Sequence, residues 1–236
     1  MRLSINRISS KSRDLRQVHG CFFLKMNKIT AIKAQRKNPQ RVSIFLDGEF
    51  AFGLTRMVAG WLQVGQILGE EKIAALKADD ELEMAYLRAI NFLSYRPRSK
   101  REIRNNLRKY KVPEMLIEPT VERLEEKGYL NDADFAKLWV ENRNAFRPRG
   151  RRALSIELRQ KGITDEIIES TLDTLVDEET LAYQAGLKKA KKLARYEWQD
   201  FRKKLAAFLA RRGFNYGIIS PLLPQLWEEV KADENE

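Results

Sequence analysis

The chain has 236 residues, of which 43% are hydrophobic and 33% are charged, and its formal net charge is +11. A single cysteine, Cys21, excludes disulfides within the chain, and a single histidine, His19, excludes a Cys/His zinc site and a histidine-based catalytic pair. No apolar run approaches the roughly 20 residues of a membrane-spanning helix, so no membrane association is expected, and the positive charge favours a polyanionic partner.

Residues 1–25 differ in composition from the rest of the chain. They carry six basic residues and one acidic residue, and their main apolar run is Cys21–Leu24. This run is too short for the apolar core of a signal peptide. We expect a basic, disordered extension or a misassigned start, because a well-patterned sequence begins at Met26; a transit peptide is the alternative.

Residues 26–80 predict a small β-region. Two β-prone runs, Val42–Leu46 and Glu49–Phe52, flank Asp47-Gly48, which is a strong hairpin turn signal. Ile29–Gln35 predicts a third strand, joined to the hairpin through a polar turn. The pattern then predicts a helix at 55–61, an extended piece at 64–68 and a helix at 70–79.

A repeat with a period of 51 residues fills the remainder of the chain. Arg96-Pro97-Arg98 recurs as Arg147-Pro148-Arg149, and seven apolar positions recur through three copies without a gap. These positions are Ile103, Leu107, Val112, Leu116, Ile117, Val121 and Leu124, then Leu154, Leu158, Ile163, Ile167, Ile168, Leu172 and Leu175, then Leu205, Leu209, Phe214, Ile218, Ile219, Leu223 and Leu226.

Each copy predicts three helices, because its apolar residues recur at intervals of three or four. Ser99 and Glu102 form a capping-box pattern at the start of the second helix, and Thr164 is a predicted N-cap. Gly162 and Gly213 stand where a second helix must end, and Lys111 takes that place in the first copy. The opening helices are predicted at 81–94, 132–145 and 179–195, and the domains at 1–25, 26–80, 81–131, 132–178 and 179–232.

The predicted fold class is therefore mainly α, with three tandem three-helix repeats after a small N-terminal β-hairpin region. Units of about 50 residues have little core of their own, so we expect neighbours to stack into a curved array.

Charges alternate in blocks along these repeats. Residues 96–111 hold eight basic residues and one acid, 147–161 hold six and one, and 188–212 hold ten and two. The intervening stretches are acidic, with five acids at 112–126 and seven at 162–179. A single block is typical of a solvated helix face, but recurrence in register indicates basic second helices and acidic third helices.

Motifs for chemistry are absent from the sequence. It contains no phosphate-binding glycine loop and no zinc-protease helix, so we expect no catalytic residues, no metal site and no cofactor. Glu118, Glu122 and Glu126 lie opposite an apolar stripe and are interpreted as a solvated face, with a carboxylate nuclease as the remote alternative. The four tryptophans, Trp61, Trp139, Trp198 and Trp227, are interpreted as packing residues rather than as platforms for base stacking.

Three segments carry a resemblance to a known family. They are Gly128–Ala136 followed by Trp139, Val140, Arg143 and Arg147–Gly150, then Tyr95–Ser99, and then Arg159–Ile163. Together they closely resemble the RecX family of bacterial regulatory proteins, over about residues 28 to 230. The third copy departs from the motif, because Trp198-Gln199-Asp200 stands where the others have Arg-Pro-Arg.

The resemblance implies three tandem three-helix repeats, a cytoplasmic location and no enzymatic activity. It also implies binding to the RecA recombinase, alone or as a filament on single-stranded DNA. Family members modulate, and mostly inhibit, strand exchange, ATP hydrolysis and coprotease function. We expect the chain to act as a monomer.

The charge pattern supplies the candidate contact residues. A basic set, expected to contact phosphates or acidic groups of the filament, comprises Arg98, Lys100, Arg101, Arg104, Arg149, Arg151 and Arg152. An acidic set, expected to contact RecA, comprises Glu114, Glu118, Glu122, Asp165, Glu166 and Glu169. We expect the two sets on separate, oppositely charged edges.

A general DNA-binding protein of helix-turn-helix-like units is the alternative function. Arg104, Asn105 and Arg108 could read base edges, but the second copy offers Ser155, Ile156 and Arg159 instead. A shared readout code is therefore not expected.

Overall fold

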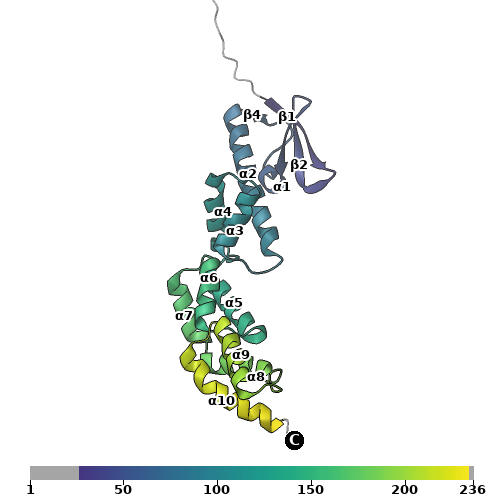
Figure 1. The fold of residues 1–236 in the computed structure, drawn as a ribbon. Helices are drawn as coiled ribbons and strands as arrows, with labels where there is room; N and C mark the ends of the chain where they lie inside the picture. Colours follow the sequence, from purple (N-terminus) through teal and green to yellow (C-terminus); the bar gives the residue numbers. More distant parts are fainter. Residues whose placement is uncertain (1–26, 234–236) are drawn as a thin grey trace, which may run out of the picture. The chain divides into compact units, whose positions relative to one another are not determined.

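In a computed structural model of the chain, the structure describes residues 27–233 (Figure 1). The expectation for residues 1–25 lies outside this range. The chain divides into two compact units between Lys77 and Ala78.

The first unit contains a four-stranded antiparallel sheet of strand order β3-β2-β1-β4. Its elements are β1 (Asn27–Gln35), β2 (Asn38–Leu46), β3 (Glu49–Thr55), α1 (Arg56–Ala59) and β4 (Ile67–Leu68). The predicted hairpin is confirmed: Asp47 and Gly48 link β2 to β3 with φ angles of 49° and 91°, as a two-residue turn between antiparallel strands requires.

Alternating side chains of the strands form the core of this unit. Ile29, Ile44 and Leu54 are completely buried, which follows from the period of two along a half-buried strand. The interpretation of Trp61 as a packing residue is wrong, because its side chain is 90% exposed. The residue stands in a turn directly after α1, where no element covers it.

The helix α2 (Glu70–Leu93) runs without interruption where the sequence predicts two helices. The expected break near residue 80 is absent, because the segment contains no glycine or proline to end a helix. From Ala78 onwards this helix belongs to the second unit. Its residues Ala85 and Ala89 are buried there against the helices that follow.

The second unit confirms the fold class, with three sets of three helices in chain order (Figure 1). The first repeat consists of α2, α3 (Lys100–Lys109) and α4 (Glu114–Glu126). The second consists of α5 (Asp132–Phe146), α6 (Arg151–Gln160) and α7 (Asp165–Leu175), and the third of α8 (Glu178–Ala190), α9 (Trp198–Arg211) and α10 (Tyr216–Asp233).

Residues separated by 51 positions occupy equivalent places in these repeats. Leu107, Leu158 and Leu209 are each completely buried, and each lies in the core cluster of its own repeat. The equivalence extends to partial burial, because Leu116, Ile167 and Ile218 are all half-buried. The sequence period is therefore a structural period.

The turns after the second helices also recur. Lys111, Gly162 and Gly213 all have positive φ angles, of 58°, 82° and 87°. A Cβ added at Gly162 would lie 2.6 Å from the Cβ of Arg101, and one added at Gly213 would lie 2.5 Å from the Cβ of Ala153. Glycine is needed at these two turns for its backbone conformation and for close approach to the preceding repeat.

Candidate nucleic-acid and protein interface

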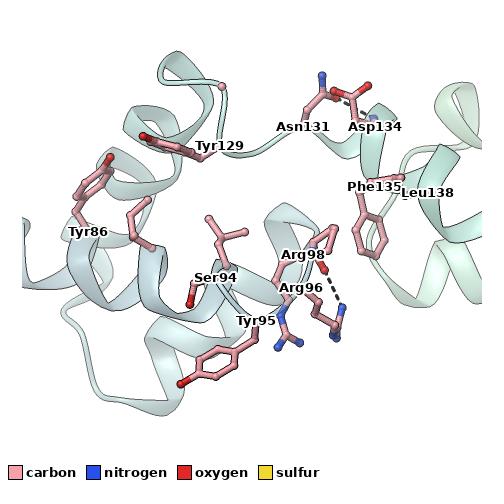
Figure 2. Close-up of a pocket in the computed structure, with 14 residues that line it drawn as sticks. Tyr86, Ser94, Tyr95, Arg96, Arg98, Tyr129, Asn131, Asp134, Phe135 and Leu138 are labelled. Atoms are coloured by element: carbon pink, nitrogen blue, oxygen red, sulfur yellow. Dashed lines mark hydrogen bonds between the residues drawn. The ribbon is translucent and has the colours of Figure 1, made fainter.

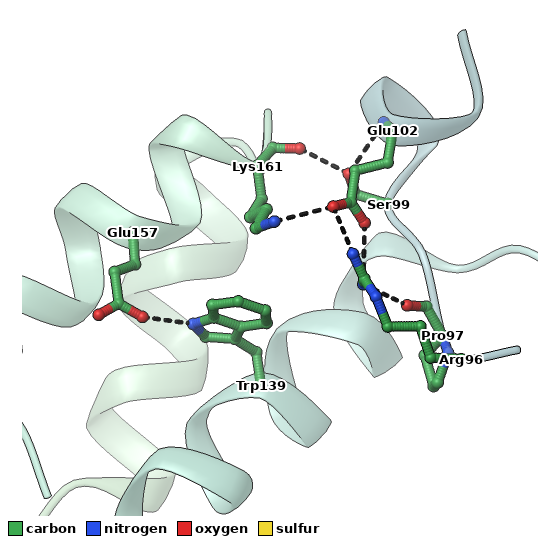
Figure 3. Close-up of polar contacts among 7 residues, drawn as sticks. All are labelled: Arg96, Pro97, Ser99, Glu102, Trp139, Glu157 and Lys161. Carbon is green, nitrogen blue, oxygen red and sulfur yellow. Dashed lines mark hydrogen bonds and ion pairs between the residues drawn. The ribbon is translucent and has the colours of Figure 1, made fainter. Parts of the chain in front are cut away.

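The same junction joins repeat 1 to repeat 2 and repeat 2 to repeat 3. The Ser99 hydroxyl donates a hydrogen bond to the Lys161 carbonyl over 2.6 Å (Figure 3). At the second junction the backbone N–H of Gly150 donates to the Arg212 carbonyl over 3.0 Å. Both partners are displaced by 51 residues, so the repeats stack through one recurring contact.

Carboxylates of the following repeat satisfy the starts of the second helices. The Lys100 N–H donates to Asp132 Oδ1, and the Arg151 N–H donates to Glu178 Oε1, each over 2.9 Å. The first N–H groups of a helix lack partners within it and carry partial positive charge, so a carboxylate there is stabilising. Each junction therefore combines an inter-repeat contact with a helix cap.

The predicted cap at Ser99 is confirmed, but Glu102 takes a different role from the one a capping box gives it. Ser99 Oγ accepts from the Glu102 N–H. The Glu102 carboxylate instead binds Arg96 over 2.9 Å and, across the junction, Lys161 over 2.8 Å (Figure 3). The predicted N-cap Thr164 precedes α7, yet its side chain makes no capping hydrogen bond.

The pKa of Glu102 lies below its ordinary value. Burial acts to raise the pKa, but hydrogen bonds from Arg96 and Lys161 and the charges of those two residues outweigh burial. The folded protein therefore holds Glu102 in its charged form more strongly than the unfolded chain does.

We expect the stabilising effect of Glu102 to depend on pH. Because its folded-state pKa is lowered, the contribution is complete above the unfolded value of about 4.3 and is lost as pH falls through the folded-state pKa. The substitution Glu102→Gln should lower the unfolding midpoint near pH 6, and the difference from wild type should shrink towards pH 3. Urea unfolding at a series of pH values measures this; a difference that does not change with pH would contradict it.

Trp139 has the packing role predicted for it. Its ring stacks on Phe135, and its indole N–H donates to Glu157 Oε2 over 2.8 Å (Figure 3). The Lys161 ammonium lies 4.9 Å from the ring centroid. Trp198 and Trp227 likewise pack against the core of repeat 3.

One ion pair joins the basic set to the acidic set, and several other members of both sets pair with residues outside the two sets. Arg104 makes two hydrogen bonds to Glu118, of 2.8 and 2.9 Å. These bonds lower the pKa of Glu118 and raise that of Arg104. The physical reason is that the second and third helices of a repeat pack together, which brings the basic block against the acidic block.

Other pairs follow the same rule. Outside the basic set, Arg108 binds Glu114 over 2.5 Å and Arg159 binds Asp165 over 2.6 Å. In the basic set, Lys100 binds Glu125 and Arg151 binds Asp173, again between a second and a third helix, whereas Arg149 binds Glu157 of the second helix that it precedes. Arg98 stacks on Phe92 at 3.8 Å, and its Nε is buried without a hydrogen-bond partner among the described residues.

The rest of both sets is exposed and carries no ion pair within the part of the chain that the structure describes. In the basic set these residues are Arg101, which makes only a long hydrogen bond of 3.4 Å to the Arg159 carbonyl, and Arg152. In the acidic set they are Glu122, Glu166 and Glu169. These five side chains can contact a partner without first breaking an internal ion pair.

Repeat 3 differs, because its basic block is not neutralised. Of the ten basic residues between Lys188 and Arg212, only Lys191 makes an ion pair in the described range, with Asp233 over 3.2 Å. The cause is the sequence of α10, whose first acid is Glu228. The sequence shows this basic block but predicts no site residues in it, because the Arg-Pro-Arg motif is missing there.

A cavity of about 660 Å³ lies between repeats 1 and 2 (Figure 2). The rings of Tyr95 and Tyr129 line it and are 76% and 59% exposed. Arg96, Arg98 and Asp134 add both signs of charge to its lining. Its mixed character does not select one kind of ligand.

Within residues 27–233 the structure offers neither a membrane-spanning helix nor a cluster of metal ligands. No helix in this range is long and apolar enough to cross a membrane. The same residues contain no group of three or more His, Cys, Asp and Glu side chains that could hold a metal ion.

Comparison with known proteins decides the family. A regulatory protein RecX of Bacillus velezensis is 35% identical to this chain over 215 residues, which cover 88% of this chain and 80% of the relative. The chain belongs to the RecX family. The regulatory protein RecX of Bacillus subtilis is 33% identical and matches 88% of this chain and 79% of its own length.

RecX family models match the N-terminal region and each of the three repeats. They are the regulatory protein RecX N-terminal domain at 27–68 and the first, second and third RecX three-helix domains at 85–124, 131–172 and 177–223. The third repeat therefore belongs to the family despite its divergent motif.

Two solved RecX structures resemble the chain in fold. A crystal structure of regulatory protein RecX has a TM-score of 0.68 and 28% identity, and the match covers 87% of this chain and 99% of that one. The RecX structure from Lactobacillus salivarius has a TM-score of 0.56 and 27% identity, with 63% and 97% covered.

Proposed function

We propose that this RecX-family chain binds the RecA recombinase and its filament on single-stranded DNA. It modulates, mostly by inhibition, strand exchange, ATP hydrolysis and the coprotease function. It acts in the cytoplasm as a monomer and has no catalytic activity of its own. The observation that carries the proposal is the RecX family match, which extends over all three repeats and the N-terminal region.

The charges of the second unit support two kinds of contact. The exposed acids Glu122, Glu166 and Glu169 lie on third helices and can bind basic groups of RecA. Arg101 and Arg152 lie on second helices and can bind phosphates or acidic groups of the filament. A chain that contacts neighbouring RecA subunits at once would fix their relative orientation and block the motions that hydrolysis and strand exchange require.

The internally paired members of both sets remain available at low cost. An exposed ion pair contributes about 0.2–1 kcal/mol, so Arg104 can exchange Glu118 for a filament group with little loss. The internal pairs also keep these long side chains ordered before binding, which reduces the entropy lost on contact. We therefore retain the complete basic and acidic sets as proposed contact residues.

The ATPase activity of RecA on single-stranded DNA, with and without this protein, tests the proposal. We expect a lower hydrolysis rate with wild type. A variant with Arg101, Arg104, Arg151 and Arg152 changed to Glu should have a much smaller effect at moderate salt, and its helical content by circular dichroism should stay unchanged. A wild-type chain without effect on hydrolysis, strand exchange or coprotease activity would contradict the proposal.

The alternative, a general DNA-binding protein, gives a different result in the same assay. Inhibition would then come from competition for the strand, and it would disappear when RecA is assembled to saturation before the protein is added. Inhibition of preassembled filaments therefore favours a RecA regulator.

A further inference from the structure

A groove of about 310 Å³ lies at the junction of repeats 2 and 3. Lys188 and Lys189 line it from the last turn of α8, and Lys192 lines it from just after that helix. Phe208 of α9, the C-cap residue Arg212 and Phe146 of α5 complete the part of the lining that matters here. The complete lining contains four cations and no carboxylate. This composition selects a negatively charged ligand.

The cations of the groove are held in place but not neutralised. Arg212 lies 4.6 Å from the ring centroid of Phe208, Lys189 lies 5.9 Å from it, and Arg212 also donates a 3.0 Å hydrogen bond to the Pro148 carbonyl. Lys188 and Lys192 are exposed, and neither makes an ion pair among residues 27–233.

The local field is positive. The pKa of Arg212 lies below its ordinary value because of burial first and the charges of Arg149 and Arg147 second. Within residues 27–233, no carboxylate acts in the opposite direction on this guanidinium. An anion that enters the groove therefore meets uncompensated positive charge.

Phe146 adds an aromatic face to this surface. It is the last residue of α5, its side chain is 77% exposed, and it belongs to none of the four core clusters of the described chain. Folding does not require the ring at this place. A ring that stands free beside four cations matches the two parts of a nucleotide, a flat base and a charged phosphate.

We propose that this groove binds single-stranded nucleic acid, with backbone phosphates on Lys188, Lys192 and Arg212 and one base stacked on Phe146. A single strand fits better than a duplex, because bases paired and stacked inside a duplex cannot reach an exposed ring. The inference gives the proposed function a specific strand-binding surface and rests on it for its biological setting. The lining of the groove contains no member of the basic set, although Arg149 of that set lies close enough for its charge to act on Arg212.

Binding of a labelled oligothymidylate to the full chain, followed by fluorescence anisotropy over a series of salt concentrations, tests the phosphate contacts. The double variant Lys188→Gln, Lys192→Gln should bind more weakly, and its log-log salt slope should be smaller by about 1.4, since each phosphate contact on a single strand contributes about 0.7. The matched control Lys127→Gln, Lys137→Gln removes two exposed lysines elsewhere and leaves the same net charge. The control should bind like wild type.

The stacking contact is tested by two variants of Phe146. Phe146→Leu keeps an apolar side chain without an aromatic face, and it should weaken binding about 5- to 150-fold, the range measured for loss of one base–aromatic stack. Phe146→Trp restores an aromatic face and should bind at least as tightly as wild type. Arg212 is left unchanged in these variants, because its carbonyl and guanidinium hold the junction between the repeats.

Equal losses in the groove variant and its matched control would overturn the proposal, because binding would then follow net charge alone. Duplex DNA that binds as tightly as the single strand, with no effect of Phe146→Leu, would overturn it as well, and so would an acidic peptide that displaces the oligonucleotide at equal charge concentration. The assay contains no RecA. A groove without strand affinity is therefore distinguished from a protein without effect on RecA.

Discussion

The substitution Leu158→Ala is expected to lower the free energy of unfolding by about 2–5 kcal/mol, the usual range for truncation of a buried leucine. Leu158 is completely buried in the cluster that also contains Leu154, Ile163 and Ile168. Leu158 lies in the middle repeat, which forms a junction with a neighbouring repeat on each side. Loosening of its core should therefore also weaken the packing of both neighbours.

Urea unfolding followed by circular dichroism measures this effect. Ile156→Ala on the same helix is the matched control, because Ile156 is 47% exposed and lies outside the core cluster. The control should change the stability by less than about 1 kcal/mol, since less apolar area is lost from contact. Similar losses in the two variants would contradict the assignment of Leu158 to a repeated core.

The repeat architecture could be predicted because the spacing of apolar residues along each helix indicates which face is buried, and this spacing occurs three times. Leu107, Leu158 and Leu209 keep their spacing, and a helix face that must be buried tolerates few polar residues. The turn positions are equally informative. A left-handed residue is needed at each, and the presence of glycine at two of three positions identified Lys111 as the third.

The continuity of α2 and the exposure of Trp61 could not be predicted from such local sequence patterns. A helix continues when nothing ends it, and the acids at 79–81 are compatible with both an N-terminus and a helix interior. For Trp61 the composition favours burial, but only the tertiary structure decides whether another element covers the ring. No pattern within a few residues of it carries that information.

The charge blocks of the repeats could be predicted from the sequence, but the contacts between their side chains could not. Arg104 and Glu118 are 14 residues apart in sequence, and their two charge blocks suggest separate surfaces. Packing of α3 on α4 places them in contact, so much of the charge is satisfied internally. In repeat 3 the basic block keeps its charge, because α10 brings no acid to the basic residues of α9. The cations without an ion pair in this repeat include those of the groove beside Phe146.

This distribution determines which substitutions should separate RecA contacts from DNA contacts. The triple variant Glu122→Gln, Glu166→Gln, Glu169→Gln removes three exposed acids that have no ion pair within the described range. If each forms one exposed pair with a basic group of RecA, at about 0.2–1 kcal/mol, their loss should weaken filament binding roughly tenfold. Binding to naked single-stranded DNA should stay unchanged or become slightly stronger, because a polyanion is repelled by the acids that are removed.

The salt dependence of binding is a second, independent measure that separates RecA contacts from DNA contacts. About five phosphate contacts on a single strand give a log-log slope of about −3.5, whereas burial of protein surface against RecA adds affinity with little release of ions. The affinity for the filament should therefore fall less steeply with salt than the affinity for naked DNA. The control Glu71→Gln, Glu141→Gln, Glu228→Gln removes three exposed acids from other places and should leave both affinities close to wild type. Equal slopes for the two targets, together with a triple variant that binds filaments normally, would show that this protein recognises the strand and not RecA.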